Sequence, residues 1–464
     1  MLAFGGCLWG SFHFDDYSLF TTQGLALHTR PLLYITFWLN HKLSGQNPAL
    51  WHAFNLLLHL VAAVLLRIVL GRLIPAPAAL TAAAIFALHP FAAEPVNYVF
   101  ARGTLLCTVL CLASLNDWTR GHYWRAVPWF AAALLAKEEC AALPVLLIML
   151  YFSATRDARQ RAPIAVMFAL SLAAGIRTIL VGIETPGSGI ATQSGIPAIG
   201  YLLTQGEVIL RYLRLLVIPW GFTVDPDIRL ASGWIPIAAW ATVLGLAALA
   251  AWRFGHAGFW FLAGLVLLLP SSSIFPAADL AADRRMYLPM IAFSACAVLL
   301  LPKRPLVLIP ILAVLTVLSF QRTKIWRTEE SLWSDAVEKA PNKIRPRLQL
   351  ARALPLDRGI QLLEQTKTIA PDDPRVASEQ GRLYLRAGNP NQALVEFGRA
   401  LALDPSSAGA LNNRGAALLA MGQTQAAVED FQRALARDPC QMDARHNLLH
   451  LGIATAPPPA TCAQ

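Results

Sequence analysis

Charged residues are scarce in this sequence of 464 residues. They make up 14% of it and hydrophobic residues 56%, whereas ordinary soluble proteins carry roughly 25% charged residues. The few charges between Trp51 and Phe320 form short clusters between apolar runs, and after Gln321 they become as frequent as in a soluble domain. This distribution excludes a chain that is soluble throughout. It predicts a membrane half, residues 1–322, followed by a soluble half, residues 323–464.

Patterns that bind metals or nucleic acids are also missing. The seven cysteines show no CxxC pair and no zinc spacing, which excludes a zinc knuckle and a dense disulfide framework. The net charge of +10 does not indicate nucleic acid, because the basic residues before position 322 lie mostly at the ends of apolar runs, as topology signals do. His446 and His450 lie four apart on a predicted helix, and we interpret them as a solvated face rather than as metal ligands. The cysteines in apolar runs are expected simply to pack there: Cys107, Cys111, Cys140 and Cys296.

Long apolar runs are abundant, and a run of about 20 residues can cross roughly 30 Å of hydrocarbon as a helix. They predict spans near residues 50–71, 78–90, 101–115, 123–136, 139–153, 163–183, 233–252, 256–271, 286–302 and 304–320. Basic residues recur at every second loop, which places those loops in the cytoplasm. The intervening loops, and everything after Phe320, are then expected to face outward. The basic loops contain Arg67 and Arg72, Arg120 and Arg125, Arg156, Arg159 and Arg161, Arg253, and Lys303 and Arg304.

Two segments need separate interpretation. Residues 201–219 are apolar but carry Glu207, Arg211 and Arg214, so we expect an amphipathic helix at the outer surface or inside an outward cavity. Residues 1–10 would cover only about 15 Å as a helix. Either the chain begins outside, or a first span precedes it.

A period of 34 residues is the clearest pattern in the soluble half. It relates Pro371, Pro405 and Pro439, and also the pairs Gly381 and Gly415, Gly388 and Gly422, Ala393 and Ala427, Phe397 and Phe431, Ala400 and Ala434, and Asp404 and Asp438. This is the tetratricopeptide period. The small residues allow two helices to approach closely, Phe fills the groove of the next repeat, and Pro stops the second helix.

The period sets the boundaries of the repeats. Full repeats are predicted at residues 374–407 and 408–441, with a capping helix to about residue 451 and degenerate repeat helices at 329–340 and 360–370. Such arrays present a concave surface that holds peptides or partner proteins. Cys440 and Cys462 are the only cysteines of this half. In an oxidising compartment they could bond and clamp the capping helix; two free thiols are the alternative.

Ionisable residues beside apolar runs are candidates for function, because they are costly to place there. The first outward segment carries Asp15 and Asp16, for which a solvated loop or a helix cap is the structural alternative. Together the outward loops place carboxylates and cations on one side of the membrane, as a site for an anionic, lipid-linked substrate requires. The later outward loops supply His89, Glu94, Arg102, Lys137, Glu138, Glu139, Asp279, Asp283, Arg284, Arg285 and Tyr287.

These residues, taken in order, resemble a known family. The matching motifs are Arg30-Pro31-Leu32 through Asn40, Asn47-Pro48, His52, Asn55, His59, His89-Pro90 with Glu94 and Arg102, Ala136-Lys137-Glu138, Arg285-Met286-Tyr287-Leu288-Pro289, and Trp326 through Trp333 to Pro341. The sequence resembles the transmembrane and tetratricopeptide-repeat protein O-mannosyltransferases and their bacterial relatives, of the GT-C glycosyltransferase class. The repeat array is much shorter than in the eukaryotic members. The resemblance implies an all-α protein, with a multispan GT-C-like membrane domain and a repeat solenoid.

The resemblance also implies roles for the matched residues. Asp15 and Asp16 correspond to the acidic pair of the first outward loop, and Asp15 would be the general base of an inverting sugar transfer. Arg102, Lys137 and Arg285, in that order, are candidates to stabilise charge on the donor phosphate. His89 and Glu94 would orient the sugar or fix the loop, and Glu138 would contribute to substrate binding. No metal ligands are assigned, although a divalent metal would be compatible with such a site.

The expected function is transfer of a sugar from a polyprenyl-phosphate donor to an outward-facing protein hydroxyl or glycan, with the repeats docking the acceptor. No cofactor is assigned beyond this donor, and membrane lipid and a protein partner are expected. The alternative is a membrane-anchored scaffold without enzymatic activity that recruits envelope proteins through its repeats. The Ala-rich composition is typical of a bacterial chain, which predicts the inner membrane with the repeats on the periplasmic or outer side.

Overall fold

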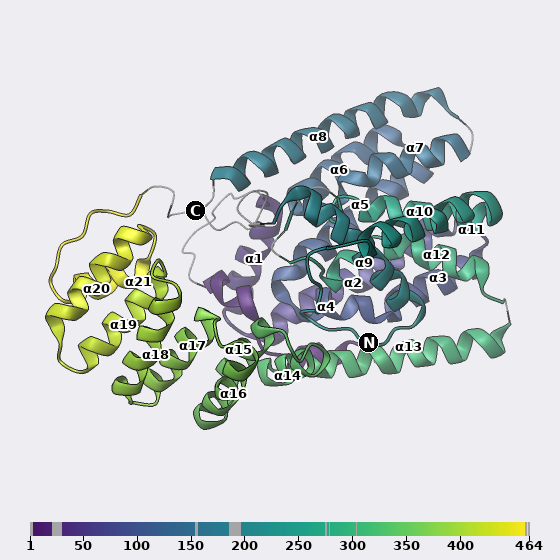
Figure 1. Cartoon of the computed structure of the whole chain (residues 1–464). Helices are drawn as coiled ribbons and strands as arrows, with labels where there is room; N and C mark the ends of the chain where they lie inside the picture. Colours follow the sequence, from purple (N-terminus) through teal and green to yellow (C-terminus); the bar gives the residue numbers. More distant parts are fainter. Residues whose placement is uncertain are drawn as a thin grey trace. The chain divides into compact units, whose positions relative to one another are not determined.

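The computed structural model describes residues 3–20, 30–153, 156–184, 196–273, 276–277, 279–302, 304–459 and 462. It divides into two compact units, Met1–Thr328 and Glu329–Gln464, where the sequence predicted a boundary after residue 322. The first unit extends further because helix α13 continues through the polar residues 321–324 and ends at Ile325. Helices form both units, and no β-strand occurs in the described ranges (Figure 1).

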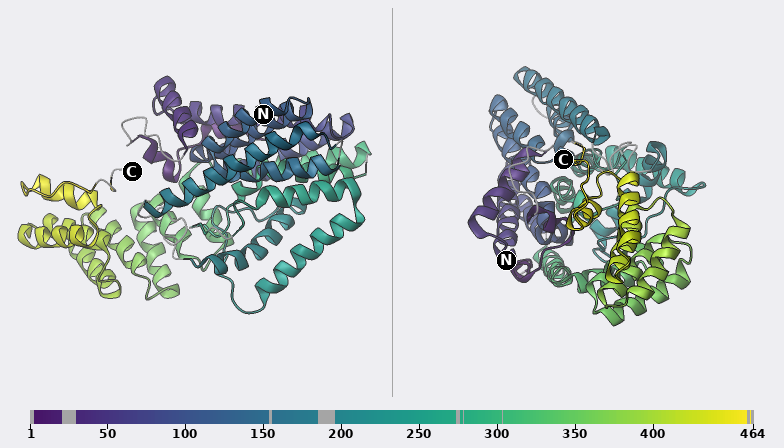
Figure 2. Two further views of the ribbon diagram at one scale, coloured as in Figure 1. Left: turned by 90° about the horizontal axis from the view of Figure 1, so that it is seen from above. Right: turned by 90° about the vertical axis from the view of Figure 1, so that its left-hand side faces the viewer.

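The first unit is a bundle of helices that run side by side (Figure 2). Its α-helices are α1 (Pro31–Ser44), α2 (Pro48–Leu70), α3 (Ala76–Leu88), α4 (Ala93–Asn97), α5 (Arg102–Thr119), α6 (Tyr123–Ala136), α7 (Leu143–Ser153), α8 (Arg161–Glu184), α9 (Ala198–Val217), α10 (Ile235–Arg253), α11 (Gly255–Leu268), α12 (Met290–Leu300) and α13 (Pro305–Ile325). Short 3₁₀ helices connect them: η1 (Gly5–Trp9), η2 (Phe14–Phe20), η3 (Pro90–Ala92), η4 (Val99–Ala101), η5 (Glu138–Ala142), η6 (Ala158–Gln160) and η8 (Asp283–Met286).

Each predicted span overlaps one of these helices, but their lengths differ. Within the described residues, five helices are long and apolar enough to cross a membrane, or six if the bent pair Ala76–Leu88 and Pro90–Asn97 is one span. Helices α7 and α12 have only 11 residues each, about 17 Å of helix. The chain is therefore an integral membrane protein, while the complete order of crossings remains a prediction.

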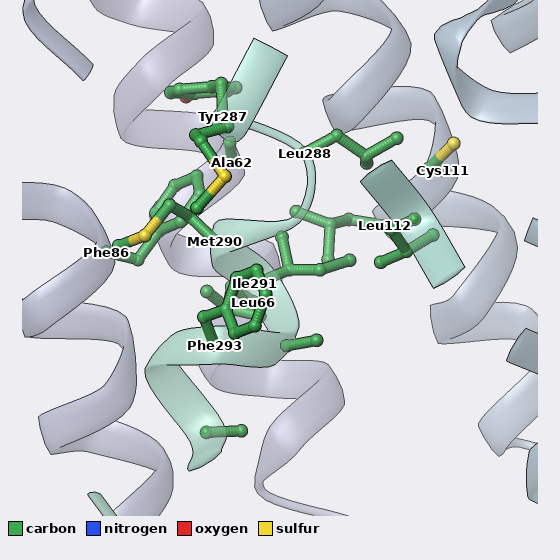
Figure 3. Packing of buried hydrophobic residues seen from close by; sticks show 14 of the residues in the cluster. Ala62, Leu66, Phe86, Cys111, Leu112, Tyr287, Leu288, Met290, Ile291 and Phe293 are labelled. Atoms are coloured by element: carbon green, nitrogen blue, oxygen red, sulfur yellow. The ribbon is translucent and has the colours of Figure 1, made fainter. Parts of the chain in front are cut away.

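The core of the bundle forms where α12 packs against α2, α3 and α5. Met290, Ile291 and Phe293 lie among side chains of those three helices (Figure 3). On its other side α12 packs against α11, where Gly264 permits the close approach, because a Cβ atom there would lie 2.6 Å from the Phe293 ring. Cys107, Cys111, Cys140 and Cys296 are buried free thiols, as expected. The amphipathic helix predicted at 201–219 is α9, which buries one face that includes Tyr201, Val208 and Tyr212.

The second unit is a row of helical hairpins, as the 34-residue period predicts. Its helices are α14 (Glu329–Lys339), α15 (Ile344–Ala353), α16 (Leu356–Ile369), α17 (Pro374–Arg386), α18 (Pro390–Leu403), α19 (Ala408–Ala420), α20 (Thr424–Arg437) and α21 (Met442–His450). The sequence did not predict α15. Phe397 of α18 lies over Gly381 and packs against Ala417 of the next repeat. Cys440 lies just before α21 and Cys462 lies in the segment that follows it. The two cysteines form a disulfide, which links the chain on either side of this helix.

Candidate functional site

The acidic pair lies in η2, close to the start of the described chain. The side chain of Asp15 lies outside the described residues. Asp16 is completely buried, and its carboxylate accepts hydrogen bonds from the backbone N–H groups of His13 at 3.0 Å, Val99 at 3.4 Å and Phe100 at 2.7 Å. Asp16 therefore attaches η2 to η4. These contacts support a positioning role for Asp16 rather than proton transfer.

The residues before the acidic pair are held by the end of α13. Ser11 donates its backbone N–H to the Arg327 carbonyl at 3.1 Å, and His13 donates from Nε2 to the Trp326 carbonyl at 2.7 Å. Burial lowers the pKa of His13 from 6.5 to about 4, although the bond to Trp326 opposes this shift. His13 is therefore neutral at physiological pH.

Phe14 connects this attachment to the acidic pair, and its backbone is strained. Its φ is +47°, a left-handed conformation that bulky residues rarely adopt. The ring of Phe14 packs edge-on against Tyr98, with ring centroids 5.4 Å apart, and against Trp326 at 6.3 Å. Strain of this kind persists only where the surroundings enforce it, and it occurs preferentially at functional sites.

Arg102 lies at the start of α5 and is fully enclosed. Its guanidinium donates to Asn55 Oδ1 at 2.8 Å, to Asn40 Oδ1 at 2.7 Å, and at 3.3 Å to the carbonyls of Thr36 and Trp51. It also lies 4.7 to 5.3 Å from the centroids of three aromatic rings, those of Phe37, Trp51 and Phe54. Arg102 therefore joins α1, α2 and α5, and this occupied guanidinium is a poor candidate for a phosphate ligand.

The first turn of α5 also contacts the motif Lys137-Glu138-Glu139. Lys137 Nζ donates to Thr104 Oγ1 at 2.7 Å and forms an ion pair with Glu139 at 2.7 Å. Glu138 accepts two hydrogen bonds from the guanidinium of Arg30. Burial alone would raise the pKa of Glu138, but the charge of Arg30 and these bonds lower it to about 2. Both acidic residues of the motif are therefore paired.

Three consecutive residues of η8 have three different partners. Asp283 pairs with Arg211 of α9 at 2.5 Å, and Arg284 pairs with Glu94 of α4 at 2.6 Å. Arg285 is buried, but its guanidinium contacts only uncharged groups, the Tyr201 hydroxyl at 3.1 Å and the carbonyls of Leu280 and Asp279. Among the described residues, no carboxylate forms an ion pair with Arg285.

His89 and Glu94 occupy structural positions at the bend after α3. His89 Nδ1 accepts the Phe91 backbone N–H at 3.2 Å, which caps η3, while Nε2 donates to the Leu216 carbonyl at 3.4 Å. His89 also lines an apolar cavity of about 750 Å³. The other walls come from α3 and α9 to α13, and include Ile85, Leu216, Phe261, Phe293, Cys296 and Leu315.

The motif Lys137-Glu138-Glu139 and Arg102 meet at the start of α5, where Lys137 donates to Thr104 two residues after Arg102. Sequence reasoning assigned no role to Arg30, Glu139 or Tyr201, although each lies in or beside a motif that it singled out. Within the described ranges, no three His, Cys, Asp or Glu side chains are grouped to hold a metal ion.

The fold and these ionisable groups define a helical membrane protein that carries tetratricopeptide repeats. The tetratricopeptide-repeat family model matches residues 378–440. Curated relatives are protein O-mannosyl-transferases, as the sequence motifs predicted. One from Caenorhabditis elegans is 24% identical over 70% of this chain and 51% of its own length. Human protein O-mannosyl-transferase TMTC3 is 22% identical over 81% of this chain and 48% of its own.

The chain thus spans about half the length of these relatives. Among solved structures, the APC/C hetero-tetramer Cut9-Hcn1 matches 81% of this chain and 78% of its own, at 14% identity and a TM-score of 0.26.

Proposed function

We propose that the protein is a membrane glycosyltransferase that moves a sugar from a polyprenyl phosphate to a hydroxyl of an outward-facing protein or glycan. The names of its relatives support sugar transfer to protein. Arg285 is the observation on which the donor assignment rests. Its buried cation has no carboxylate partner among the described residues, and an anionic substrate group would supply one.

The apolar cavity supports a lipid-linked donor. Its walls are almost entirely hydrocarbon and belong to helices of the membrane unit, so a prenyl chain would be solvated there as it is in lipid. Lys137 is a weaker candidate for the phosphate than Arg285, because Glu139 already neutralises it at 2.7 Å. We assign Arg102 a positioning role.

In the proposed reaction the acceptor oxygen attacks the anomeric carbon while the bond from that carbon to the phosphate oxygen breaks. Polyprenyl phosphate leaves as an anion beside Arg285, and the hydroxyl proton passes to the carboxylate of Asp15. The configuration at the sugar carbon inverts. The fixed positions of His13, Phe14 and Asp16 support this role for Asp15, because they hold the backbone on both sides of it.

We place the protein in a bacterial inner membrane with its repeats on the periplasmic side. The alternation of basic loops supports this orientation. The disulfide between Cys440 and Cys462 supports it too, since disulfides persist in oxidising compartments.

The proposal can be tested by measuring the transfer of labelled sugar from polyprenyl phosphate. The assay uses membranes that contain each variant at matched abundance. Asp15→Asn removes the base but keeps the side-chain size, so we expect a loss of about 10² to 10⁴-fold. Asp227→Asn is the control, because Asp227 is an exposed acid between α9 and α10 and its variant should keep full activity. If Asp15→Asn retained more than about a tenth of the activity, Asp15 would not be the base.

A further inference from the structure

The first helices of the first two hairpins are basic. Helix α15 carries three arginines and no acid, and α17 three arginines and one acid, whereas α16 and α18 carry equal numbers of basic and acidic residues. One stripe of α17 carries Arg375, Ser378, Arg382 and Arg386, spaced three or four residues apart; the first and last are exposed and the other two half-buried. Arg375 pairs with Asp373, the residue before the helix, at 2.6 Å. The only acid of α17, Glu379, is buried and accepts from Arg352 of α15 at 2.7 Å and from Arg382 at 2.6 Å. One carboxylate therefore lies between two arginines whose side chains remain 42% and 40% exposed.

This basic stripe lies on the inner side of the solenoid. Successive first helices, α15, α17, α19 and α21, contact one another more closely than the second helices α16, α18 and α20 do. The more closely spaced row forms the inner, concave side of such an array. Because α16 and α18 cover the back of α17 and its flanks adjoin α15 and α19, its exposed face lies on that inner side.

The residues on the inner face change from basic to small and neutral along the row of first helices. On α15 the corresponding stripe carries the exposed Arg345 and Arg352 and the half-buried Gln349. On α19 it carries the half-buried Gly409, Asn413 and Ala416 and the exposed Ala420. Adjacent helices pack about 8–10 Å apart, so the four first helices extend over about 24–30 Å. An extended chain at about 3.3 Å per residue covers that distance with roughly seven to nine residues.

We propose that this inner face docks an extended acidic segment of the acceptor protein, with its carboxylates on α15 and α17 and its small or neutral residues on α19. This proposal depends on the proposed function at one point only, because it takes the docked protein to be the acceptor of the sugar. Arg386 and Arg382 supply guanidinium groups to the carboxylates, since such groups bind carboxylates with good geometry. The small side chains of α19 leave room for the chain to lie close to the helix.

Binding measured by fluorescence anisotropy on the full-length protein in neutral nanodiscs tests this proposal without any transfer reaction. The probe is a labelled peptide of about nine residues that begins with four acidic residues and continues with Gly, Ala and Ser. A second peptide replaces each Asp and Glu by Asn and Gln. We expect at least about tenfold weaker binding of the neutral peptide, and a decrease of acidic-peptide affinity with salt.

Arg386→Glu and Arg437→Glu form a matched pair. Both arginines are exposed, both end a helix, and neither has an ion pair among the described residues. Arg386 ends a first helix and Arg437 a second helix, so only Arg386→Glu should weaken acidic-peptide binding, by about tenfold. Equal binding by the two variants, or equal binding of the two peptides, would overturn the proposal. Displacement of the peptide by anionic phospholipid vesicles but not by neutral ones would assign the stripe to a membrane surface instead. None of these outcomes depends on donor or catalysis.

Discussion

The buried charges of the membrane unit differ in how they are neutralised, and this difference separates the roles of single residues. Asp16 is hydrogen-bonded by backbone N–H groups, and Glu138 pairs with Arg30. Arg102 and Arg285 donate hydrogen bonds only to neutral oxygens among the described residues, but they differ in how far they are occupied. All three guanidinium nitrogens of Arg102 donate hydrogen bonds, whereas in Arg285 only Nη1 and Nη2 do, and Nε has no partner in the described part of the chain. A charge already compensated within the protein maintains the structure, whereas an uncompensated one is available to a substrate.

Asp16→Asn should destabilise the membrane unit. An amide has one acceptor oxygen, so at least one of the three backbone N–H groups now bonded to Asp16 would lose its partner, at a cost of about 1–3 kcal/mol. Thermal unfolding in detergent measures this change. Asp227→Asn, at an exposed position, should leave the melting temperature unchanged. Equal melting temperatures for the two variants would show that the Asp16 contacts are dispensable.

His13 should make the stability of this unit depend on pH. Its pKa is about 4 when folded, against 6.5 as the ordinary value, so acid protonates the unfolded state first. The free energy of unfolding should therefore be at its full value above pH 6.5 and should fall as the pH approaches 4, by up to roughly 3 kcal/mol. In His13→Gln, the amide can still donate to the Trp326 carbonyl but does not titrate. Its melting temperature should fall less between pH 6.5 and 4, and superimposable profiles would contradict the assignment.

At the level of elements, the sequence predicted what depends on local periodicity. The apolar runs located helices such as α2 and α8, and the 34-residue period located α17 to α20. The sequence could not predict that Arg102 would be enclosed, because the residues that surround its guanidinium come from two other helices, α1 and α2. The family resemblance singled out Arg285, but the sequence could not show that Arg284 pairs with Glu94 while its neighbour Arg285 has no ion pair among the described residues. In a 3₁₀ helix with about three residues per turn, successive side chains point about 120° apart, so these neighbours meet different elements.

Gly381→Ala should loosen the first full repeat. A Cβ atom at position 381 would lie 2.7 Å from the Phe397 ring, whereas one at Gly398 would have nothing within 4 Å. Both substitutions gain the same helix propensity, about 1 kcal/mol, so their difference isolates the clash. Hydrogen exchange of the full chain should become faster in α17 and α18 for Gly381→Ala, and slower or unchanged for Gly398→Ala. Equal protection would mean that Phe397 can move aside without cost.

On the scale of the whole molecule, the proposed chemistry requires one topology. The base, Arg285 and the repeats must all face the compartment that contains the acceptor. A reporter enzyme that is active only in the cytoplasm should be silent when fused after Gln464, and active when fused after Arg120 in a predicted cytoplasmic loop. Activity after Gln464 would place the repeats on the opposite side and separate them from Asp15.

The attachment of residues 11–13 to the end of α13 has a consequence for biosynthesis. The carbonyls of Trp326 and Arg327 that hold Ser11 and His13 are among the last parts of the membrane unit to leave the ribosome. The acidic segment, although synthesised before α13, can reach its final conformation only after α13 has been inserted. A nascent chain that is still being translated would therefore lack the positioned Asp15 that the proposed function requires, and under that proposal activity would begin only once the whole membrane unit is in place.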